Sequence, residues 1–504
     1  MKMLASAKSI TRSCSMTVPN EVMLITYGDS MGENLHQLNH ILDAYFAGAV
    51  GGVHLLPFFP SSGDRGFSPM NYTTVDPRLG SWHDVDALAE KNYLMADLMI
   101  NHLSRQSAEF QDYLQHHDQS DYAGMFLNWD KFWPANRPTQ ADVDLIYKRK
   151  DKAPYQEITF ADSNQSKVWN TFSEEQIDLD VNAPQAKAMF RTTMAIFAKH
   201  HINIVRLDAF AYAVKKLDTN DFFVEPDIWK LLESISSEAE KHQLTVLPEI
   251  HEHYTLPRKV SEHGYYTYDF ALPMLILYTL FKGDATNLLN WLAASPMHQF
   301  TTLDTHDGIG IVDVKDVLND QQIDFTTKQL YERGSNVKKV YSSATYNNLD
   351  IYQINTTYYS ALGEDNRAYL LARALQIFAP GIPQIYYVGL LAGKNDLELL
   401  EATKEGRNIN RHYYTESEVA QEVKRPVVRD LLKLLRFRNQ EPAFDLDGSL
   451  TIEKTDNAHF TLIRRNQAQT HTATLTVDLT TLRFSVQADN DVLTLETEQE
   501  NSND

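Results

Sequence analysis

Two charged residues interrupt a stretch that otherwise has the pattern of a buried strand. In HINIVRLDAF, residues 201–210, the surrounding residues are apolar and rich in β-branched side chains, which is typical of a strand buried on both faces. Arg206 and Asp208 are two positions apart, so a strand would point both side chains to the same face. Because burying a charge is costly unless the charge is paired or used, these two residues indicate a functional site.

Carboxylates end two further apolar runs. Glu249 lies near the end of VLPEIH and Asp307 near the end of TTLDTHDG. A single acid in such a place often only caps the next helix, but three acids together favour a shared site. If both runs are strands to their last residues, Glu249 shares a face with His251, whereas His306 lies on the opposite face from Asp307.

Converging carboxylates are suited to the cleavage of a glycosidic bond. This reaction needs a general acid at the leaving oxygen and a second carboxylate at the anomeric carbon. Crowding raises the pKa of one carboxyl group, which then stays protonated as the acid. We expect Arg206 to hold Asp208 ionised as the nucleophile.

The elements that must position these residues alternate between strands and helices. Helical patterns lie between several of the apolar runs, as at 33–46, 186–201 and 227–242. About eight repeats of strand and helix predict an α/β fold, a (β/α)8 TIM barrel, whose chemistry lies at the carboxyl ends of its strands. The predicted strands fall within residues 22–28, 51–59, 93–102, 202–210, 244–251, 265–273, 299–308 and 381–389.

Two long gaps and a change of pattern divide the chain. The gaps between predicted strands are typical of loop domains inserted over the active face of a barrel. The last 60 residues alternate apolar and polar residues, which predicts a small antiparallel β-domain. We divide the chain into an N-terminal extension (1–20), barrel segments (21–102, 183–308 and 364–443), two inserted loop domains (103–182 and 309–363) and the C-terminal β-domain (444–504).

Composition excludes several classes of function. The formal net charge is −21, so nucleic acid is not an expected partner, because binding it depends on Lys and Arg that neutralise phosphates. Cys14 is the single cysteine, so no intrachain disulfide can form. No run approaches the length of a membrane span or of a signal-peptide core. We expect a cytoplasmic protein, monomeric or homodimeric, without a membrane partner.

Four short strings identify a family. DLMINH, VRLDAFAY, LPEIHEHY and LDTHDG resemble, in order, the four conserved-region motifs of the α-amylase superfamily, glycoside hydrolase family 13. Longer strings such as GVHLLPFFPSSGDRGFSPMNY and KEGRNINRHYY resemble the sucrose-cleaving phosphorylases of that family, especially those of lactic acid bacteria. This closer resemblance covers roughly residues 21–445.

The resemblance implies a reversible, cofactor-free glucosyl transfer. Sucrose and phosphate give fructose and α-D-glucose 1-phosphate by a retaining double displacement through a β-glucosyl-enzyme. By motif position, Asp208 is the nucleophile, Glu249 the acid/base and Asp307 the stabiliser of the transition state. The substrate-binding residues that the resemblance implies on the donor side, or that lie in the same motifs, are Asp64, Phe67, His102, Phe172, Arg206, Tyr212, His306 and Arg407.

The same resemblance implies an acceptor site built from both inserts. It assigns phosphate to Arg137 of NRPTQ and to Tyr352, and fructose to Asp350 and Gln353. A carboxylate repels phosphate, so Asp350 and Tyr352 are expected to alternate between the two acceptors by loop movement. The basic string KRKDK, residues 148–152, is expected to be a solvated loop, with a phosphate patch for a phosphorylated acceptor as the alternative.

Other interpretations stay open. Asn101 could bind calcium, as an asparagine of this motif does in amylases, but the remaining oxygen ligands cannot be identified, so no metal is expected. Sucrose 6-phosphate could replace sucrose, which would require extra cations near the fructose site. Hydrolysis, glucosyl transfer to another acceptor such as a glycerol derivative, and a binding-only role are further alternatives.

Overall fold

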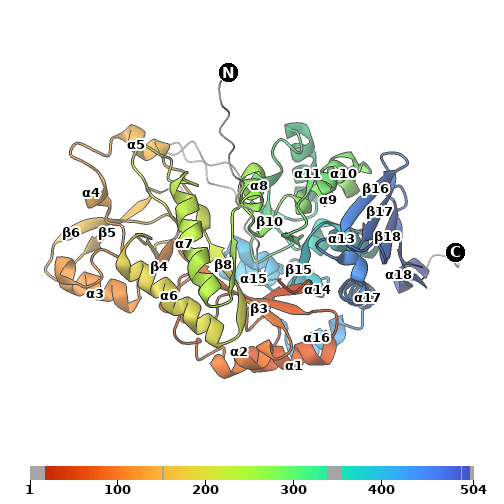
Figure 1. The fold of residues 1–504 in the computed structure, drawn as a ribbon, viewed down its shortest axis with the longest axis horizontal. Helices are drawn as coiled ribbons and strands as arrows, with labels where there is room; N and C mark the ends of the chain where they lie inside the picture. Colours follow the sequence, from red (N-terminus) through yellow and green to blue (C-terminus); the bar gives the residue numbers. More distant parts are fainter. Residues whose placement is uncertain (1–17, 150–151, 338–352, 490, 500–504) are drawn as a thin grey trace, which may run out of the picture.

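Eight parallel strands form one sheet at the centre of the molecule (Figure 1). The structure is a computed structural model that describes residues 18–149, 152–337, 353–489 and 491–499. The strands are hydrogen-bonded in the order β10-β11-β15-β1-β2-β3-β8-β9, so the last one in the chain lies beside the first. The predicted (β/α)8 barrel is therefore confirmed. Its strands are β1 (Met23–Thr26), β2 (Gly52–Leu55), β3 (Tyr93–Met99), β8 (Ile202–Asp208), β9 (Thr245–Pro248), β10 (Thr267–Asp269), β11 (Gln299–Thr302) and β15 (Ile382–Tyr386).

Apolar side chains fill the interior of the barrel. They form a cluster that includes Met23, Met95, Ile204, Leu247, Tyr268, Phe300 and Ile382, each from a different barrel strand. Two residues beyond Ile204, on the same face of β8, Arg206 lies beside Asp97 of β3 in the strand register. The charged residues thus begin where the apolar layer ends, toward the carboxyl ends of the strands.

Each predicted apolar run contains one barrel strand, but the strands end earlier than the runs. The clearest difference is at β11, which stops at Thr302, whereas the run was predicted to be a strand to residue 308. Residues 303–308 form a loop, so the alternation of faces does not apply to them. The prediction that His306 lies on the opposite face from Asp307 fails for this reason, because its premise of a continuing strand is wrong.

Helices surround the sheet, and the three predicted helical patterns are confirmed as α1 (Leu35–Tyr45), α6 (Pro184–Lys199) and α7 (Asp227–Lys241). In α7 the residues that recur every three or four positions, from Ile228 to Ala239, are buried, which gives the helix one apolar face toward the sheet. The other helices of the barrel segments are α2 (Trp82–Ala89), α8 (Thr255–Glu262), α9 (Leu272–Lys282), α10 (Thr286–Ala294), α13 (Asn366–Phe378), α14 (Tyr387–Leu390), α15 (Leu397–Thr403), α16 (Glu416–Glu422) and α17 (Pro426–Gln440). Among the described residues, no helix has the length and apolarity that crossing a membrane requires.

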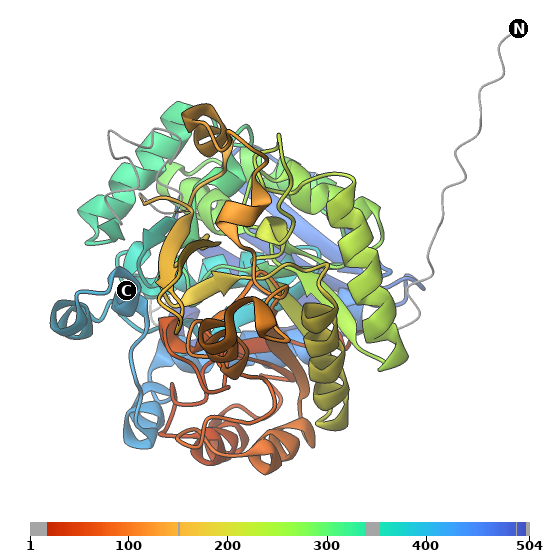
Figure 2. The same cartoon turned by 90° about the vertical axis from the view of Figure 1, so that its left-hand side faces the viewer.

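The first insert, between β3 and α6, has a small core of its own. Trp129, Trp133 and Trp169 cluster with Ile146. The insert lies at the left of Figure 1 and faces the viewer in Figure 2. Its elements are β4 (His102–Ser104), α3 (Ala108–His116), α4 (Trp129–Phe132), α5 (Gln140–Leu145), β5 (Tyr155–Thr159), β6 (Gln165–Trp169) and β7 (Gln176–Asp178).

The second insert is built around a small antiparallel sheet. Its elements are β12 (Ile309–Gly310), the 3-10 turn η4 (Val312–Val314), α11 (Asp320–Glu332), β13 (Asn336–Val337), β14 (Gln353–Asn355) and α12 (Tyr358–Ala361). In β14, Gln353 pairs with Gly310 of β12. Residues 338–352 lie outside the described part of the chain, and so do the predicted acceptor residues Asp350 and Tyr352.

The C-terminal region is an antiparallel sheet of β16 (Ser449–Lys454), β17 (His459–Arg465), β18 (Thr472–Asp478), β19 (Arg483–Ala488) and β20 (Asp491–Val492), as predicted. The alternating pattern predicts that strand continues toward the end of the chain, but the chain leaves β20 after Val492 and forms α18 (Glu496–Gln499). Asp430 of α17 accepts hydrogen bonds from the backbone nitrogens of Glu496 (2.9 Å) and Thr497 (2.8 Å), which draws this end away from the sheet.

The described chain begins in a packed position. Val18 is buried and belongs to the apolar cluster of the barrel. Asn20 donates a hydrogen bond to the backbone oxygen of Phe444 (2.8 Å). Residues 18–20 are therefore part of the packed body and not of a loose extension, while residues 1–17 lie outside the described part of the chain.

Candidate active site

A pocket opens where the carboxyl ends of the barrel strands meet the two inserts. Eleven of the residues proposed from the sequence line it, and it also contains residues that the sequence did not single out, above all Arg149 and His251. Two proposed arginines are not part of the wall. Arg206 lies behind it and contacts Asp208, and Arg137 does not line the pocket. The proposed residues in the wall are Asp64, Phe67, His102, Phe172, Asp208, Tyr212, Glu249, His306, Asp307, Gln353 and Arg407.

Arg206 holds two carboxylates at the end of β8. Its Nη1 lies 2.9 Å from Oδ1 of Asp208 and also contacts the buried carboxylate of Asp97. Nε2 of His54 lies 2.8 Å from the other oxygen of Asp97. Although burial opposes ionisation, His54 and Arg206 lower the pKa of Asp97 to about 2. Arg206 therefore forms an ion pair with the ionised carboxylate of Asp97 as well as contacting Asp208.

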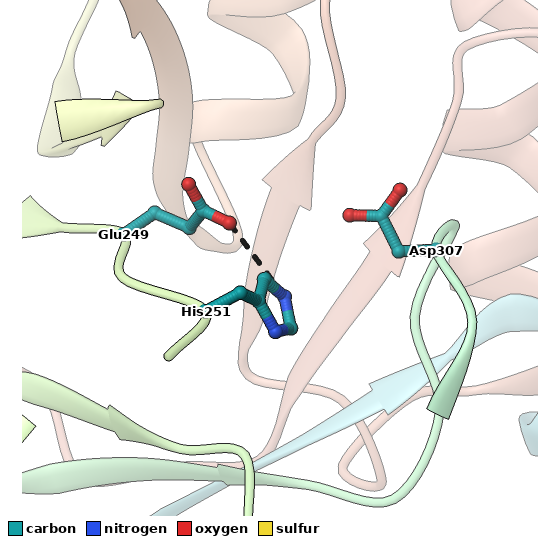
Figure 3. Close-up of side chains that lie close together, drawn as sticks. All are labelled: Glu249, His251 and Asp307. Carbon is teal, nitrogen blue, oxygen red and sulfur yellow. Dashed lines mark ion pairs between the residues drawn. The ribbon is translucent and has the colours of Figure 1, made fainter. Parts of the chain in front are cut away.

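Glu249 lies next to Asp208 and shares the same arginine. Its Oε2 accepts a hydrogen bond from the backbone nitrogen of Ala209 (3.1 Å), and its Oε1 lies 3.7 Å from Nη2 of Arg206. Nε2 of His251 lies 3.6 Å from the same oxygen, as Figure 3 shows. The two side chains thus lie together as expected, but β9 ends at Pro248, so the alternation of a strand is not what brings them together.

The crowded carboxylates retain a proton near neutral pH. Burial raises the pKa of Asp208 to about 8 against the attraction of Arg206, and the charges of Glu249, Asp97 and Asp307 add to the rise. The expectation that Arg206 holds Asp208 ionised is thus not met, because burial outweighs the attraction of a guanidinium that also pairs with Asp97. A carboxyl group that keeps its proton in a crowded site is what acid catalysis beside a nucleophile requires.

Asp307 is ionised and held by another arginine. Nη1 of Arg407 lies 2.9 Å from Oδ1 of Asp307. Burial favours the neutral acid, but the charge of Arg407, with smaller effects from nearby histidines, holds the pKa of Asp307 well below its usual range. A permanent negative charge at this place can stabilise positive charge that develops on a bound sugar.

Aromatic and imidazole rings form the wall beside Asp307. The ring of Phe67 stacks on that of His306, with centroids 4.8 Å apart and planes 7° apart. Nε2 of His102 donates a hydrogen bond to the backbone oxygen of Phe67 (2.9 Å). Gly66 makes this loop possible: its φ is +108°, and a Cβ there would lie 2.5 Å from a backbone oxygen. Phe172 closes the wall, edge-on to His102 at 5.6 Å.

Arg149 occupies the side of the pocket next to Glu249. It donates hydrogen bonds to the hydroxyl of Tyr212 and to the backbone oxygen of His251 (3.2 Å). The expectation of a solvated loop at 148–152 is wrong for Lys148, which is buried, and for Arg149, which lines the pocket; residues 150–151 are not described. The density of basic residues in KRKDK was the signal for this site.

Arg137 has a different environment. Its Nη2 lies 2.5 Å from Asp142 and 2.8 Å from Asp218, and its guanidinium lies over the ring of Trp133. Its partners are Asp142 of the first insert and Asp218 of the loop between β8 and α7. The structure therefore brings Arg149, and not Arg137, to the pocket.

An ammonium group contacts the asparagine that was weighed as a calcium ligand. Nζ of Lys215 lies 3.0 Å from Oδ1 of Asn101 and 3.1 Å from Oδ2 of Asp178, and it also donates to the backbone oxygen of Tyr212. Each of these oxygens would suit a calcium ion, but here they surround a lysine.

The side chains of Glu249, His251 and Asp307 have polar atoms within 4.8 Å of one another, a spacing that could hold a metal ion. Figure 3 shows the three around a common space. Two arginines already neutralise this group, since Arg206 approaches Glu249 and Arg407 pairs with Asp307. The arrangement fits a neutral sugar better than it fits a further cation.

Comparison with known proteins agrees with this arrangement. The model of the α-amylase catalytic domain matches residues 45–430. The chain is 58% identical to a sucrose phosphorylase from Streptococcus mutans serotype c, over 95% of this chain and 100% of that protein. It is 43% identical to a sucrose 6(F)-phosphate phosphorylase from Thermoanaerobacterium thermosaccharolyticum, over 87% and 91%. The crystal structure of sucrose 6F-phosphate phosphorylase from Thermoanaerobacter thermosaccharolyticum superposes with a TM-score of 0.91 at 40% identity, covering 95% of this chain and 98% of that one.

Proposed function

The chain belongs to the α-amylase family, glycoside hydrolase family 13, and we propose that it is a sucrose phosphorylase. The enzyme transfers the glucosyl group of sucrose to phosphate and gives D-fructose and α-D-glucose 1-phosphate. The 58% identical relative is a sucrose phosphorylase, whereas the relative that acts on sucrose 6-phosphate is 43% identical. This difference supports unmodified sucrose as the substrate.

The first half-reaction makes a covalent intermediate. The carboxylate of Asp208 attacks the anomeric carbon of the glucosyl unit while Glu249 gives its proton to the oxygen of the departing fructose. The ionised Asp307 stabilises the positive charge that develops on the sugar ring. At the end of this step Asp208 carries a β-linked glucosyl unit and Glu249 is a carboxylate.

The second half-reaction reverses these roles with a new acceptor. An oxygen of hydrogen phosphate attacks the anomeric carbon, and the bond to Asp208 breaks, so Asp208 leaves as a carboxylate. Glu249 takes the remaining proton of the phosphate, which restores the acid and yields glucose 1-phosphate as the dianion. Two displacements on opposite faces leave the α configuration unchanged.

The guanidinium of Arg149 is the observation that carries the choice of phosphate. It is anchored on Tyr212 and on the backbone of His251, and His251 is the neighbour of Glu249. Since the acid protonates the leaving fructose, its side of the pocket is also the side from which the acceptor attacks. A protein of net charge −21 needs a local cation at that place to bind phosphate.

We also propose the wider setting of this activity. The chemistry runs on side chains alone and needs no cofactor, and the partners are sucrose, phosphate, fructose and glucose 1-phosphate, not nucleic acid. The protein acts in the cytoplasm as a monomer or homodimer. The division into barrel, inserts and C-terminal domain at the residues given above is part of the same proposal.

The test is product analysis with two donors. Purified protein is incubated with sucrose, with and without phosphate, and fructose, glucose and glucose 1-phosphate are quantified; sucrose 6-phosphate is tested in parallel. The proposal predicts glucose 1-phosphate in amounts equal to fructose, dependence on phosphate, and a higher kcat/KM for sucrose than for sucrose 6-phosphate. Free glucose as the main product, or a preference for sucrose 6-phosphate, would contradict it.

A further inference from the structure

Two buried polar atoms face each other behind the pocket. Nδ1 of His251 lies 3.8 Å from Oδ1 of Asp313, and neither atom has a hydrogen-bond partner among the described residues. Asp313 is 3% exposed, so bulk solvent does not reach it. Because an unsatisfied buried polar atom is costly, the two atoms are each other's partner, and a movement of roughly 1 Å brings them to hydrogen-bond distance.

The position of the His251 ring leaves little freedom in what its nitrogens contact. The ring stacks on Phe270, with centroids 3.6 Å apart and planes 16° apart. With Nδ1 toward Asp313, Nε2 points to the pocket and lies 3.6 Å from Oε1 of Glu249. Figure 3 shows the ring beside Glu249 and facing Asp307. The carboxylate of Asp313 is thus behind the ring, and the reacting groups are in front of it.

The backbone makes room for this carboxylate at one glycine. A Cβ at Gly310 would lie 1.9 Å from Oδ2 of Asp313, so only glycine fits there. Gly310 pairs in turn with Gln353, the residue of the second insert that lines the pocket. Asp313 therefore belongs to the same local unit as the acceptor side of the pocket.

We propose that Asp313 is a positioning residue for the phosphate half-reaction: it orients the ring of His251 and balances a positive charge on it, so that Nε2–H faces the incoming phosphate. This inference rests on the proposed function. Arg149 donates to the backbone oxygen of His251, so the guanidinium and the imidazolium form one wall of two cations. The binding of a neutral acceptor does not depend on the positive charge of His251.

The charges around His251 favour its protonated form. Burial lowers the pKa of His251, but the carboxylate of Asp313, followed by those of Glu249 and Asp307, outweighs burial and raises it. The charged and titratable groups that face the pair come from five segments: Glu249 and Glu252 from its own segment, Asp269 from the end of β10, Asp307 from the loop after β11, Asp313 from η4 and Arg149 from the first insert. Asp313 is the one whose contact is with Nδ1, away from the reaction.

The experiment compares Asp313→Asn with a matched control. Asp316→Asn removes the carboxylate of a second histidine–aspartate pair, in which Asp316 lies 3.1 Å from His253, on the surface, with 73% of its side chain exposed. For both variants, the phosphate KM, the pH dependence of kcat/KM for phosphate, glucosyl transfer to glycerol and the kcat/KM for α-glucosyl fluoride are measured. Thermal melting establishes that each variant is folded.

Asp313→Asn is expected to raise the phosphate KM roughly tenfold at pH 7, the factor that corresponds to one pKa unit of lost interaction. The alkaline limb of the phosphate profile should move to lower pH, because His251 loses its proton more easily. Transfer to glycerol and reaction with α-glucosyl fluoride should stay within about twofold of wild type, and Asp316→Asn should match wild type in every measurement.

A double variant separates positioning from a general structural role. In the His251→Gln background, adding Asp313→Asn should change the phosphate KM no further, since the carboxylate acts through that ring. An unchanged phosphate KM and pH profile in the single variant, or equal losses with phosphate and glycerol, would overturn the inference. If the wild-type protein releases no glucose 1-phosphate, it is the proposed function that fails.

Discussion

Nη1 of Arg206 lies 2.9 Å from Oδ1 of Asp208, and the same nitrogen contacts the ionised carboxylate of Asp97. One guanidinium thus orients the nucleophile, but its electrostatic attraction is divided between Asp208 and Asp97. Because the charge of Arg206 is shared, burial can raise the pKa of Asp208 to about 8. The site can therefore hold a proton for the leaving group and still present a carboxylate for attack.

Replacing the nucleophile should abolish turnover. Asp208→Asn keeps the shape of the side chain but cannot form the glucosyl ester. We expect less than about 0.1% of the wild-type rate of glucose 1-phosphate formation, a loss of the size seen when other enzymes lose their nucleophile. Rates should be measured on protein whose mass excludes deamidation back to aspartate. A residual activity of several per cent would assign the nucleophilic role elsewhere.

The same substitution should stabilise the fold in a pH-dependent way. The pKa of Asp208 is raised by burial from 3.8 to about 8, so the folded protein binds more protons than the unfolded protein between these values. The free energy of unfolding therefore falls as pH rises over this range, by at most about 1.4 kcal/mol per pH unit. Asp208→Asn removes this loss, so its gain in melting temperature over wild type should be larger at pH 8 than at pH 5. An equal difference at both pH values would contradict the raised pKa.

The acid/base should be dispensable for a good leaving group. Glu249→Gln cannot protonate the departing oxygen of fructose, but fluoride leaves without a proton. The loss of kcat/KM relative to wild type should be far smaller with α-glucosyl fluoride than with sucrose. Equal losses with the two donors would show that Glu249 acts in some other way.

Two arginines of the first insert provide a matched test of phosphate recognition. Arg149→Ala should raise the phosphate KM about 10- to 150-fold, because a charge-assisted hydrogen bond contributes about 1.5–3 kcal/mol. Formation of the glucosyl-enzyme should be little changed, and hydrolysis should rise as a share of turnover, since water needs no cation.

Arg137→Ala is the control for this prediction. Arg137 pairs with Asp142 and Asp218 outside the pocket wall, so its removal should leave the phosphate KM within about twofold of wild type. A large rise in the phosphate KM for Arg137→Ala, with none for Arg149→Ala, would restore the assignment that the sequence resemblance suggested.

The barrel and its reacting carboxylates were predictable because both depend on local patterns. Apolar runs mark the eight strands, and each reacting acid lies near the end of such a run. The faces were predictable only as far as a strand continues, and both strands end before the residues of interest. β9 ends at Pro248, yet Glu249 and His251 still meet, whereas β11 ends at Thr302 and the following loop turns both His306 and Asp307 into the pocket.

The acceptor side was less predictable because it depends on contacts between segments that are distant in the sequence. Arg149 lies in a charged string that resembles a solvated loop, yet its partners are Tyr212 and His251. Asp313 carries no motif that points to His251, and only the folded second insert brings the two together. Spacing in the sequence contains no information on such pairs.

The most direct test of the proposed mechanism is to trap the glucosyl-enzyme and then release it with phosphate. Glu249→Gln is incubated with α-glucosyl fluoride without phosphate, quenched in acid and mapped by peptide mass spectrometry; wild-type protein with sucrose is then treated with phosphate and its product is analysed by NMR. The mechanism predicts one glucosyl unit on Asp208, and glucose 1-phosphate of α configuration as the product. Turnover without any adduct, an adduct on another residue, or a β product would contradict it.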